Sequence, residues 1–195
     1  YKEQVEKLTK ELVERVAVPS IGEVKIDGAS LTYEVVQTKA AQHFVGPKGE
    51  KSSVLNFNVP TLIWKNAEGI VVRHPDCPAI DKAYKFRLKY LLKFLTAFVF
   101  NQPIWAHGHT GTGKTTFAEQ VAARLGFPFD RLNLDSNLER ADIVGSVEIT
   151  AEGGTSVTKF REGILPRLMQ QPYMFVLDEI DAGRPDMLFV IQRAL

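Results

Sequence analysis

Eight consecutive residues near the middle of the chain, GHTGTGKT at 108–115, could bind the phosphates of a nucleotide. They match the pattern G-x-x-x-x-G-K-[ST], in which glycines let the backbone curl so that several N–H groups face one anion. Lys114 is expected to reach the β- and γ-phosphates, and the hydroxyl of Thr115 is expected to ligate Mg²⁺. An ordinary glycine-rich turn needs neither a lysine nor a hydroxyl in this order. The pattern therefore predicts a site for a magnesium-bound nucleotide.

Two adjacent carboxylates, Asp178 and Glu179, follow the apolar run YMFVL at 173–177. An acid at the end of a buried strand is suited to hold the Mg²⁺ of a bound nucleotide. The next acid could act on the water that attacks the γ-phosphate, because hydrolysis requires a base or an orienting group there. Taken alone, the pair could also be a solvated strand end. Together with residues 108–115, it predicts Asp178 as a metal ligand and Glu179 as a catalytic residue.

The elements that would position these residues alternate between strand and helix after Asn101. The expected order is a strand IWAH (104–107), the glycine-rich turn, a helix TTFAEQVAARL (115–125), a strand FDRLNL (129–134), a helix near EGILPRLMQ (162–170), the strand YMFVL and a last helix from about 185. Such alternation predicts an α/β fold, the parallel sheet flanked by helices of a P-loop NTPase. The hairpin pattern at 147–158 is expected to be an insertion. The sheet is expected to be truncated after the last helix.

Residues 1–73 are expected to form a small, mostly β accessory region, separate from an ATPase core at 74–195. The run KEQVEKLTKELVERV at 2–16 has the periodicity of an amphipathic helix. Short β-branched runs cut by turn residues follow, and LIWKNAEGIVV at 62–72 is a possible hairpin. Two prolines within HPDCPAID at 74–81 indicate a linker.

A basic amphipathic helix is expected at 82–100. Its apolar stripe consists of Tyr84, Leu88, Leu91, Leu95 and Phe98. Lysines and an arginine share the remaining surface, which is more simply a solvated face than a phosphate-binding one. The stretch is also too short and too often interrupted by lysine to cross a bilayer.

Composition excludes several classes of protein. The 195 residues carry a formal net charge of +1, which argues against a chain whose main role is to coat nucleic acid or an acidic membrane. One cysteine, Cys77, forms no internal disulfide, and no signal or membrane-spanning segment is visible, so a cytoplasmic setting is expected. His107 and His109 lack a nearby third ligand and are not expected to bind a metal. The first residue is Tyr1, so the sequence is expected to be a piece of a longer polypeptide.

These motifs resemble a known family. The segments GHTGTGKTT, EQVAARLGFP, NLDSNLERADIVG, KFREGILP and LDEIDAGRPDMLFVIQRAL are similar to the ATPase core of the cobaltochelatase small-subunit (CobS) type, within the MoxR group of AAA+ ATPases. The likeness runs from about Asp76 to Leu195. It implies an AAA+ fold, Mg²⁺-dependent hydrolysis of ATP, and a homo-oligomer, expected to be a hexameric ring, that uses ATP on another protein.

The resemblance also implies roles for individual residues. It assigns to the phosphates the residues Gly108, His109, Thr110, Gly111, Thr112, Gly113, Lys114, Thr115 and Thr116. It assigns Asp178 to the metal and Glu179 to the water, and it places Ile80 and Asp81 near the adenine. The hairpin at 147–158 resembles an insertion that faces the ring channel and touches the client. A partner with a von Willebrand factor A domain is expected, as are a sensor, an arginine finger and a lid beyond Leu195.

Two other classes remain open. A P-loop nucleotide kinase shares the phosphate loop, but a water-activating Glu179 would be out of place beside a phosphoryl acceptor. A nucleic-acid-dependent AAA+ motor is supported only by the basic part of the expected helix, residues 82–93. The ATPase activity of such a motor would rise with single-stranded DNA, and this stimulation would be lost with rising salt.

Overall fold

The computed structural model describes residues 21–26, 28–44, 53–134, 138–152 and 155–192. The chain divides into two compact units, residues 1–129 and 130–195, and each unit is described by itself. The predicted helix at 2–16 lies outside the described residues, as do residues 153 and 154 of the predicted hairpin at 147–158. The predicted boundary between an accessory region and an ATPase core near residue 73 stays a prediction.

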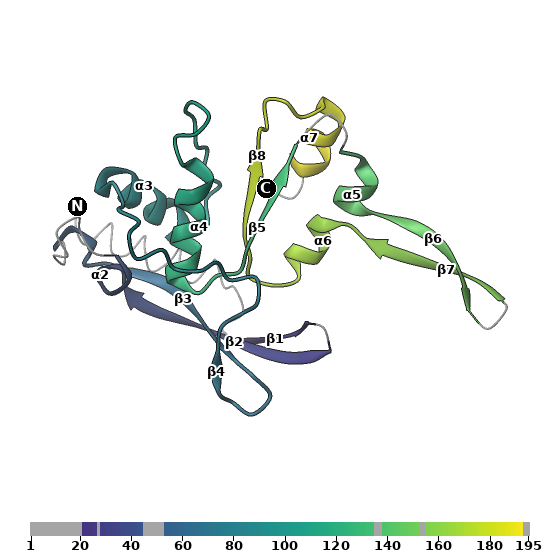
Figure 1. Cartoon of the computed structure of the whole chain (residues 1–195), viewed down its shortest axis with the longest axis horizontal. Coiled ribbons are helices and arrows are strands. Elements are labelled where there is room, and N and C mark those ends of the chain that lie inside the picture. Colours follow the sequence, from purple (N-terminus) through teal and green to yellow (C-terminus); the bar gives the residue numbers. More distant parts are fainter. Residues whose placement is uncertain (1–20, 27, 45–52, 135–137, 153–154, 193–195) are drawn as a thin grey trace. The chain divides into compact units, whose positions relative to one another are not determined.

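The first unit begins with a four-stranded antiparallel sheet, as expected for a mostly β accessory region (Figure 1). Its strands, in spatial order, are β1 (Ile21–Ile26), β2 (Ala29–Lys39), β3 (Asn58–Lys65) and β4 (Val71–Val72). The short helix α2 (Ala40–His43) and the 3₁₀ turn η1 (Ser53–Leu55) lie between β2 and β3. Tyr33 and Trp64 oppose each other across β2 and β3 with ring centroids 5.4 Å apart, an aromatic pair that fixes the register. The predicted hairpin at 62–72 is confirmed by β3 and β4.

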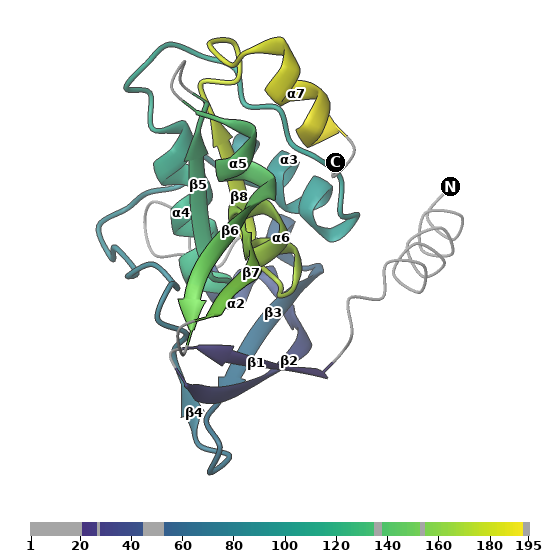
Figure 2. The same ribbon diagram turned by 90° about the vertical axis from the view of Figure 1, so that its right-hand side faces the viewer.

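Two helices of the first unit, α3 (Leu88–Val99) and α4 (Lys114–Leu125), lie side by side in two perpendicular views (Figures 1 and 2). The Phe94 ring of α3 meets the Phe117 ring of α4 at 5.5 Å between centroids. The helix α3 ends at Val99, and Asn101, two residues later, has a positive φ of 49°, the left-handed conformation that commonly follows a helix. Aromatic packing at one face therefore joins the basic helix to the helix that follows the phosphate loop.

The prediction of a helix from residue 82 is wrong at its start. The helix begins at Leu88, and Tyr84 and Phe86 lie before it. The Phe86 ring is the centre of an aromatic cluster, with edge contacts to Phe44 at 5.2 Å and to Phe117 at 5.3 Å between centroids. The spacing of Tyr84 and Leu88 indicated a helix only weakly, and packing of the aromatic rings overrides this local preference.

The segment 74–81, predicted to be a linker, is anchored within the first unit. His74 and Cys77 are buried, and the Asp76 carbonyl accepts a hydrogen bond from the Phe129 N–H at 3.1 Å. Burial also raises the pKa of the Cys77 thiol. The prolines here interrupt regular structure, as expected, but they do not make the segment a free connection.

Gly126 ends α4 at a point where no side chain fits. Its φ is 77°, and a Cβ atom there would lie 2.3 Å from the carbonyl oxygen of Leu62. The Gly126 carbonyl in turn accepts a hydrogen bond from the Trp64 indole N–H at 2.9 Å. Glycine is therefore required both for the backbone conformation and for the close approach of β3.

Gly126→Ala is expected to lower the free energy of unfolding by about 2 kcal/mol or more, because left-handed strain and overpacking add at this site. Urea denaturation checks the value. Gly69→Ala is the matched control, because Gly69 has a φ of 78° but open space where the added methyl group would lie, so only the backbone strain is added. Equal losses for the two variants would show that the contact with Leu62 imposes no constraint.

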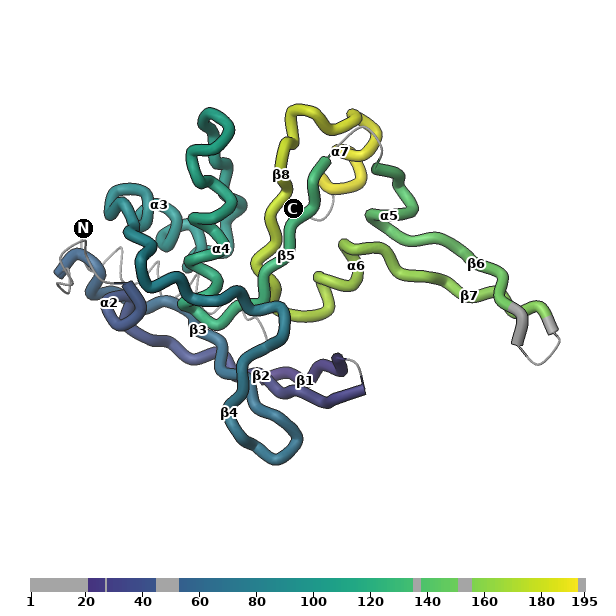
Figure 3. Tube along the Cα trace, in the orientation of Figure 1, coloured from purple at the N-terminus to yellow at the C-terminus, as the bar shows by residue number. Residues whose placement is uncertain are grey.

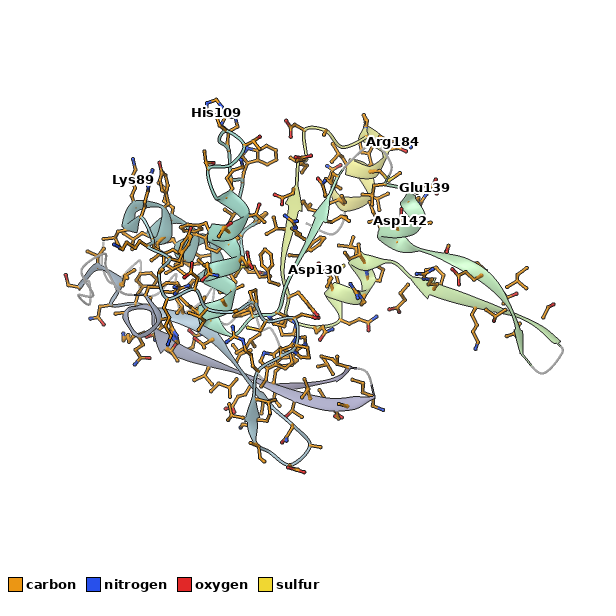
Figure 4. The ribbon with its side chains drawn as sticks, in the orientation of Figure 1. Lys89, His109, Asp130, Glu139, Asp142 and Arg184 are labelled. Carbon is orange, nitrogen blue, oxygen red and sulfur yellow. The ribbon has the colours of Figure 1, made fainter. Side chains whose placement is uncertain are left out.

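The second unit contains the predicted alternation of strand and helix. The strands β5 (Phe129–Asn133) and β8 (Met174–Asp178) pair in parallel, and α5 (Arg140–Val144), α6 (Ile164–Met169) and α7 (Pro185–Gln192) accompany them. Its buried core consists of Leu134, Ile143, Met187 and Ile191. Glu139 and Asp142, labelled in Figure 4, form a capping box at the start of α5. These elements confirm the α/β fold class with a parallel sheet.

The predicted insertion is a hairpin of β6 (Gly145–Glu152) and β7 (Thr155–Glu162), longer than the 147–158 expected. In the tube view it extends away from α5 and α6, the two helices at its base (Figure 3). Its base is closed by the Gly163 N–H, which donates to the Val144 carbonyl at 3.2 Å. The hairpin thus projects from its unit, with only its base held by neighbouring elements.

Candidate nucleotide site

The glycine-rich loop runs directly into the first turn of α4, as the motif requires. Gly111 and Gly113 have φ values of 78° and 81°, a left-handed conformation that side chains disfavour. The Lys114 ammonium donates hydrogen bonds to the carbonyls of Gly108 at 2.8 Å and His109 at 3.0 Å. The loop therefore curls around the ammonium of Lys114, the group that is expected to bind phosphate oxygens in loops of this type.

The remaining residues of the motif are also placed at the helix start. The Thr112 hydroxyl donates to the His109 carbonyl at 2.8 Å, which closes the turn at the top of the loop, where Figure 4 labels His109. Thr115 and Thr116 are the second and third residues of α4, and no side chain caps this end of the helix. The first N–H groups of α4 and its positive dipole end are therefore directed toward the loop, as a phosphate site requires.

The segment before the loop differs from the prediction. No strand is assigned anywhere between residues 101 and 113, all of which are described, and Trp105 within the predicted strand IWAH is exposed. A strand exists only through backbone hydrogen bonds to a neighbour, which an apolar run cannot supply alone. The prediction of a strand at 104–107 is therefore wrong, although the segment does lie directly before the loop.

The two predicted acids lie at the end of β8 in the second unit. Asp178 is the last residue of β8, and its carbonyl accepts a hydrogen bond from the Leu134 N–H at 3.0 Å. Glu179 has a φ of 55°, a left-handed conformation that is uncommon for glutamate. Its carbonyl accepts from the Ala182 N–H at 2.8 Å, which closes a turn before α7. The strained residue is the one predicted to act on water, and such strain is concentrated at functional sites.

An arginine near Asp178 escaped the sequence analysis. The Arg131 guanidinium on β5 lies 3.8 Å from the Asp178 carboxylate, and its side chain is exposed. At this distance and exposure the attraction between the two side chains is weak. No sequence signal linked these two residues, because their contact depends on the pairing of β5 with β8.

The predicted adenine contacts, Ile80 and Asp81, lie beside α4. The Asp81 N–H donates to the Gln120 side-chain oxygen at 2.9 Å, and the Gln120 amide donates to the Ala79 carbonyl at 3.1 Å. The structure therefore brings this segment to the same helix whose first turn carries the phosphate loop. Gln120 carried no motif, so sequence reasoning missed it.

In the part of the chain that the structure describes, no three His, Cys, Asp or Glu side chains gather as a metal site. The predicted metal ligands, Thr115 and Asp178, each carry a hard oxygen donor of the kind that Mg²⁺ binds. Among the described helices, none has the length and apolar character needed to span a membrane.

The comparisons with known proteins agree with this geometry. Residues 106–195 match the family described as AAA domain (dynein-related subfamily). This stretch therefore resembles part of the AAA+ domain of that family. The chain is 48% identical over 118 residues to the aerobic cobaltochelatase subunit CobS of a Sinorhizobium species, covering 60% of this chain and 36% of that protein.

Two further relatives support a MoxR-type AAA+ ATPase. The denitrification regulatory protein NirQ of Stutzerimonas stutzeri is 33% identical over 98 residues, covering 50% of this chain and 34% of the relative. The protein NorQ of Paracoccus denitrificans is also 33% identical over 98 residues, covering 50% of this chain and 35% of the relative. The chain thus spans about a third of the length of these relatives. No solved structure matches it.

Proposed function

We propose that this chain is part of a cytoplasmic, Mg²⁺-dependent ATPase that assembles as a hexameric ring and uses ATP to remodel a partner protein. The observation that carries the proposal is the loop at 108–115, which curls around the Lys114 ammonium at the N-terminus of α4. Relatives named for cobalt chelation and for denitrification share the domain, which supports a common ATP-driven step with different clients. A partner with a von Willebrand factor A domain belongs to this proposal.

Each residue has a role in the proposed reaction. Lys114 and the loop N–H groups bind the β- and γ-phosphates, and Ile80 and Asp81 contact the adenine. Thr115 and Asp178 would hold Mg²⁺, which would neutralise charge on the phosphates when bound. Glu179 orients and deprotonates the attacking water. Hydrolysis is favoured over transfer of the γ-phosphoryl group to another acceptor, because Glu179 is suited to activate a water molecule.

A hydrolysis assay on the full-length protein tests the proposal. We expect Mg²⁺-dependent release of phosphate from ATP that is unchanged by single-stranded DNA. Stimulation by DNA that disappears as salt increases would instead support the nucleic-acid motor, with the basic residues of α3 as phosphate contacts. Transfer of the γ-phosphoryl group to an added nucleoside, without hydrolysis, would support a kinase.

The hairpin is the proposed contact with the client. The pairing of Val147 with Phe160 and of Ile149 with Thr158 puts three large apolar side chains on one face. They are exposed to 65% (Val147), 75% (Ile149) and 58% (Phe160). The opposite face carries the ion pair of Glu148 with Arg161 at 3.2 Å. A projecting hairpin with one apolar face is suited to grip a protein, because such exposed patches commonly mark interaction sites.

Replacing Val147, Ile149 and Phe160 together by serine is expected to reduce partner-stimulated hydrolysis about tenfold, because apolar anchors dominate binding energy at such contacts. Basal hydrolysis should be unchanged, since the hairpin carries none of the proposed site residues. The partner is first captured with the Glu179→Gln variant and ATP, and its stimulation of each variant is then measured. Glu148→Gln, on the opposite face, is the matched control. Full stimulation of the serine variant would remove the apolar face from client binding.

A further inference from the structure

A buried glutamine on α4 binds the backbone on both sides of Ile80. Gln120 is only 5% exposed, and both polar atoms of its side chain are hydrogen-bonded. Its amide N–H donates to the Ala79 carbonyl at 3.1 Å, and its oxygen accepts from the Asp81 N–H at 2.9 Å. One side chain thus pairs with residues i and i+2 of the segment, as the neighbouring strand of a β-ladder does.

An arginine one turn along α4 completes this arrangement. The Arg124 guanidinium donates to the Gln120 oxygen at 2.7 Å and to the Asp81 carbonyl at 2.7 Å. It also lies over the Phe86 ring, 4.9 Å from the centroid. Burial lowers the pKa of Arg124 and the nearby Asp81 carboxylate raises it, and the group stays charged because guanidinium is not deprotonated in proteins. The orientation of the Gln120 amide is therefore fixed, with its oxygen toward two donors.

Ile80, between Ala79 and Asp81, has backbone groups that Gln120 does not bind. Along an extended backbone the N–H and C=O groups of successive residues face opposite ways, so those of Ile80 face away from Gln120. Within the residues that the structure describes, no hydrogen bond joins the backbone N–H or C=O of Ile80. The residue as a whole is 45% exposed. Ile80 therefore presents an adjacent donor and acceptor to any ligand at this edge.

We propose that Gln120 is a positioning residue that sets selectivity for the adenine base, by holding residues 79–81 so that the Ile80 backbone pairs with the base edge. This inference rests on the proposed function of the loop at 108–115. An adenine edge combines the N6 amino donor with a ring nitrogen acceptor, which matches one C=O and one N–H. Guanine has the O6 acceptor in place of the amino group and would face the Ile80 carbonyl with a second acceptor.

The geometry favours this role over one in packing alone. A glutamine that served only to fill the core would be replaceable by an apolar residue, because burying a polar amide is costly unless it is bonded. Here both hydrogen bonds are directed to the residues that flank Ile80, and α4 also carries the phosphate loop on its first turn. The glutamine thus fixes the distance and angle between the base-reading backbone and the phosphate-binding loop.

Calorimetric titration of the full-length protein with Mg²⁺-ADP, Mg²⁺-GDP and inorganic pyrophosphate tests the inference. The variant Gln120→Met keeps the volume of the side chain and removes its hydrogen bonds. We expect the preference of this variant for ADP over GDP to fall about tenfold. This corresponds to the loss of two hydrogen bonds of ordinary strength, those between the Ile80 backbone and the base. The affinity of the variant for pyrophosphate should equal that of the parent. Glu119→Gln, the neighbouring residue on α4, is the control and should keep the parent's preference.

The titrations distinguish a failure of the role inferred for Gln120 from a failure of the proposed function. An unchanged ratio of ADP to GDP affinity would overturn the inference, whether both affinities are retained or both fall together as a purely structural defect would cause. If Gln120→Met does not fold, Gln120→Ala is measured by the same ratio, because a smaller side chain avoids any clash. A parent protein that binds neither ADP nor pyrophosphate would refute the proposed function itself, and a parent that binds pyrophosphate but does not distinguish ADP from GDP would refute the inference alone.

Discussion

Replacing Glu179 by glutamine is expected to reduce ATP turnover about 10²- to 10⁴-fold, while Mg²⁺-nucleotide binding stays near that of the parent. Glutamine keeps the size of the side chain and loses the base, and general base catalysis contributes an effect of this size. The left-handed backbone at Glu179 is unchanged by this substitution, so the turn before α7 should be preserved. Phosphate release by the full-length protein and calorimetry with Mg²⁺-ADP measure the two quantities separately.

A second acid in the same turn provides the control. Asp181 is exposed and lies two residues after Glu179, so Asp181→Asn removes a carboxylate of similar location without changing the proposed catalytic group. This variant should retain turnover within about twofold, as is usual for an exposed surface substitution of small energetic effect. Comparable turnover by Glu179→Gln and the parent would remove Glu179 from the mechanism, and an equal loss in both variants would indicate a general effect of negative charge.

The most predictable parts of the molecule were those whose signals are local. The helix after the loop begins at Lys114 and ends at Leu125, within one residue of the prediction, because glycines mark both of its ends. The strand β8 and its terminal acid were also located from a short apolar run followed by charge. In each case the residues that decide the structure are neighbours in the sequence.

The parts that failed depend on contacts distant in the sequence. The start of α3 was misplaced because Phe86 packs on Phe44 and Phe117, and no periodicity within 82–100 encodes that cluster. The segment 74–81 resembled a linker because its prolines are visible in the sequence, whereas its bonding partner Gln120 lies far along the chain. The strained φ of Glu179 is equally invisible, because glutamate gives no sign of a left-handed backbone.

Lys114→Ala is expected to abolish measurable binding of Mg²⁺-ADP. A lysine among phosphate oxygens makes charge-assisted hydrogen bonds, each worth about 1.5–3 kcal/mol, so losing two or more of them weakens binding by about 10²-fold or beyond. The fold should persist, because the Lys114 ammonium bonds only to exposed carbonyls of its own loop. Binding is measured by calorimetry, and melting in the presence of nucleotide gives an independent value.

Melting with and without nucleotide distinguishes the parent from the Lys114→Ala variant. At a ligand concentration of about 100 times the dissociation constant, binding stabilises the parent by about 2.7 kcal/mol, whereas the variant at the same concentration should gain almost none. Lys89→Ala is the matched control, because Lys89 is an exposed lysine of α3 outside the loop (Figure 4), and it should gain as much as the parent. A folded Lys114→Ala protein with the full gain would show that the nucleotide binds elsewhere. If Lys89→Ala also lost the stabilisation by nucleotide, the binding would instead be assigned to the basic face of α3.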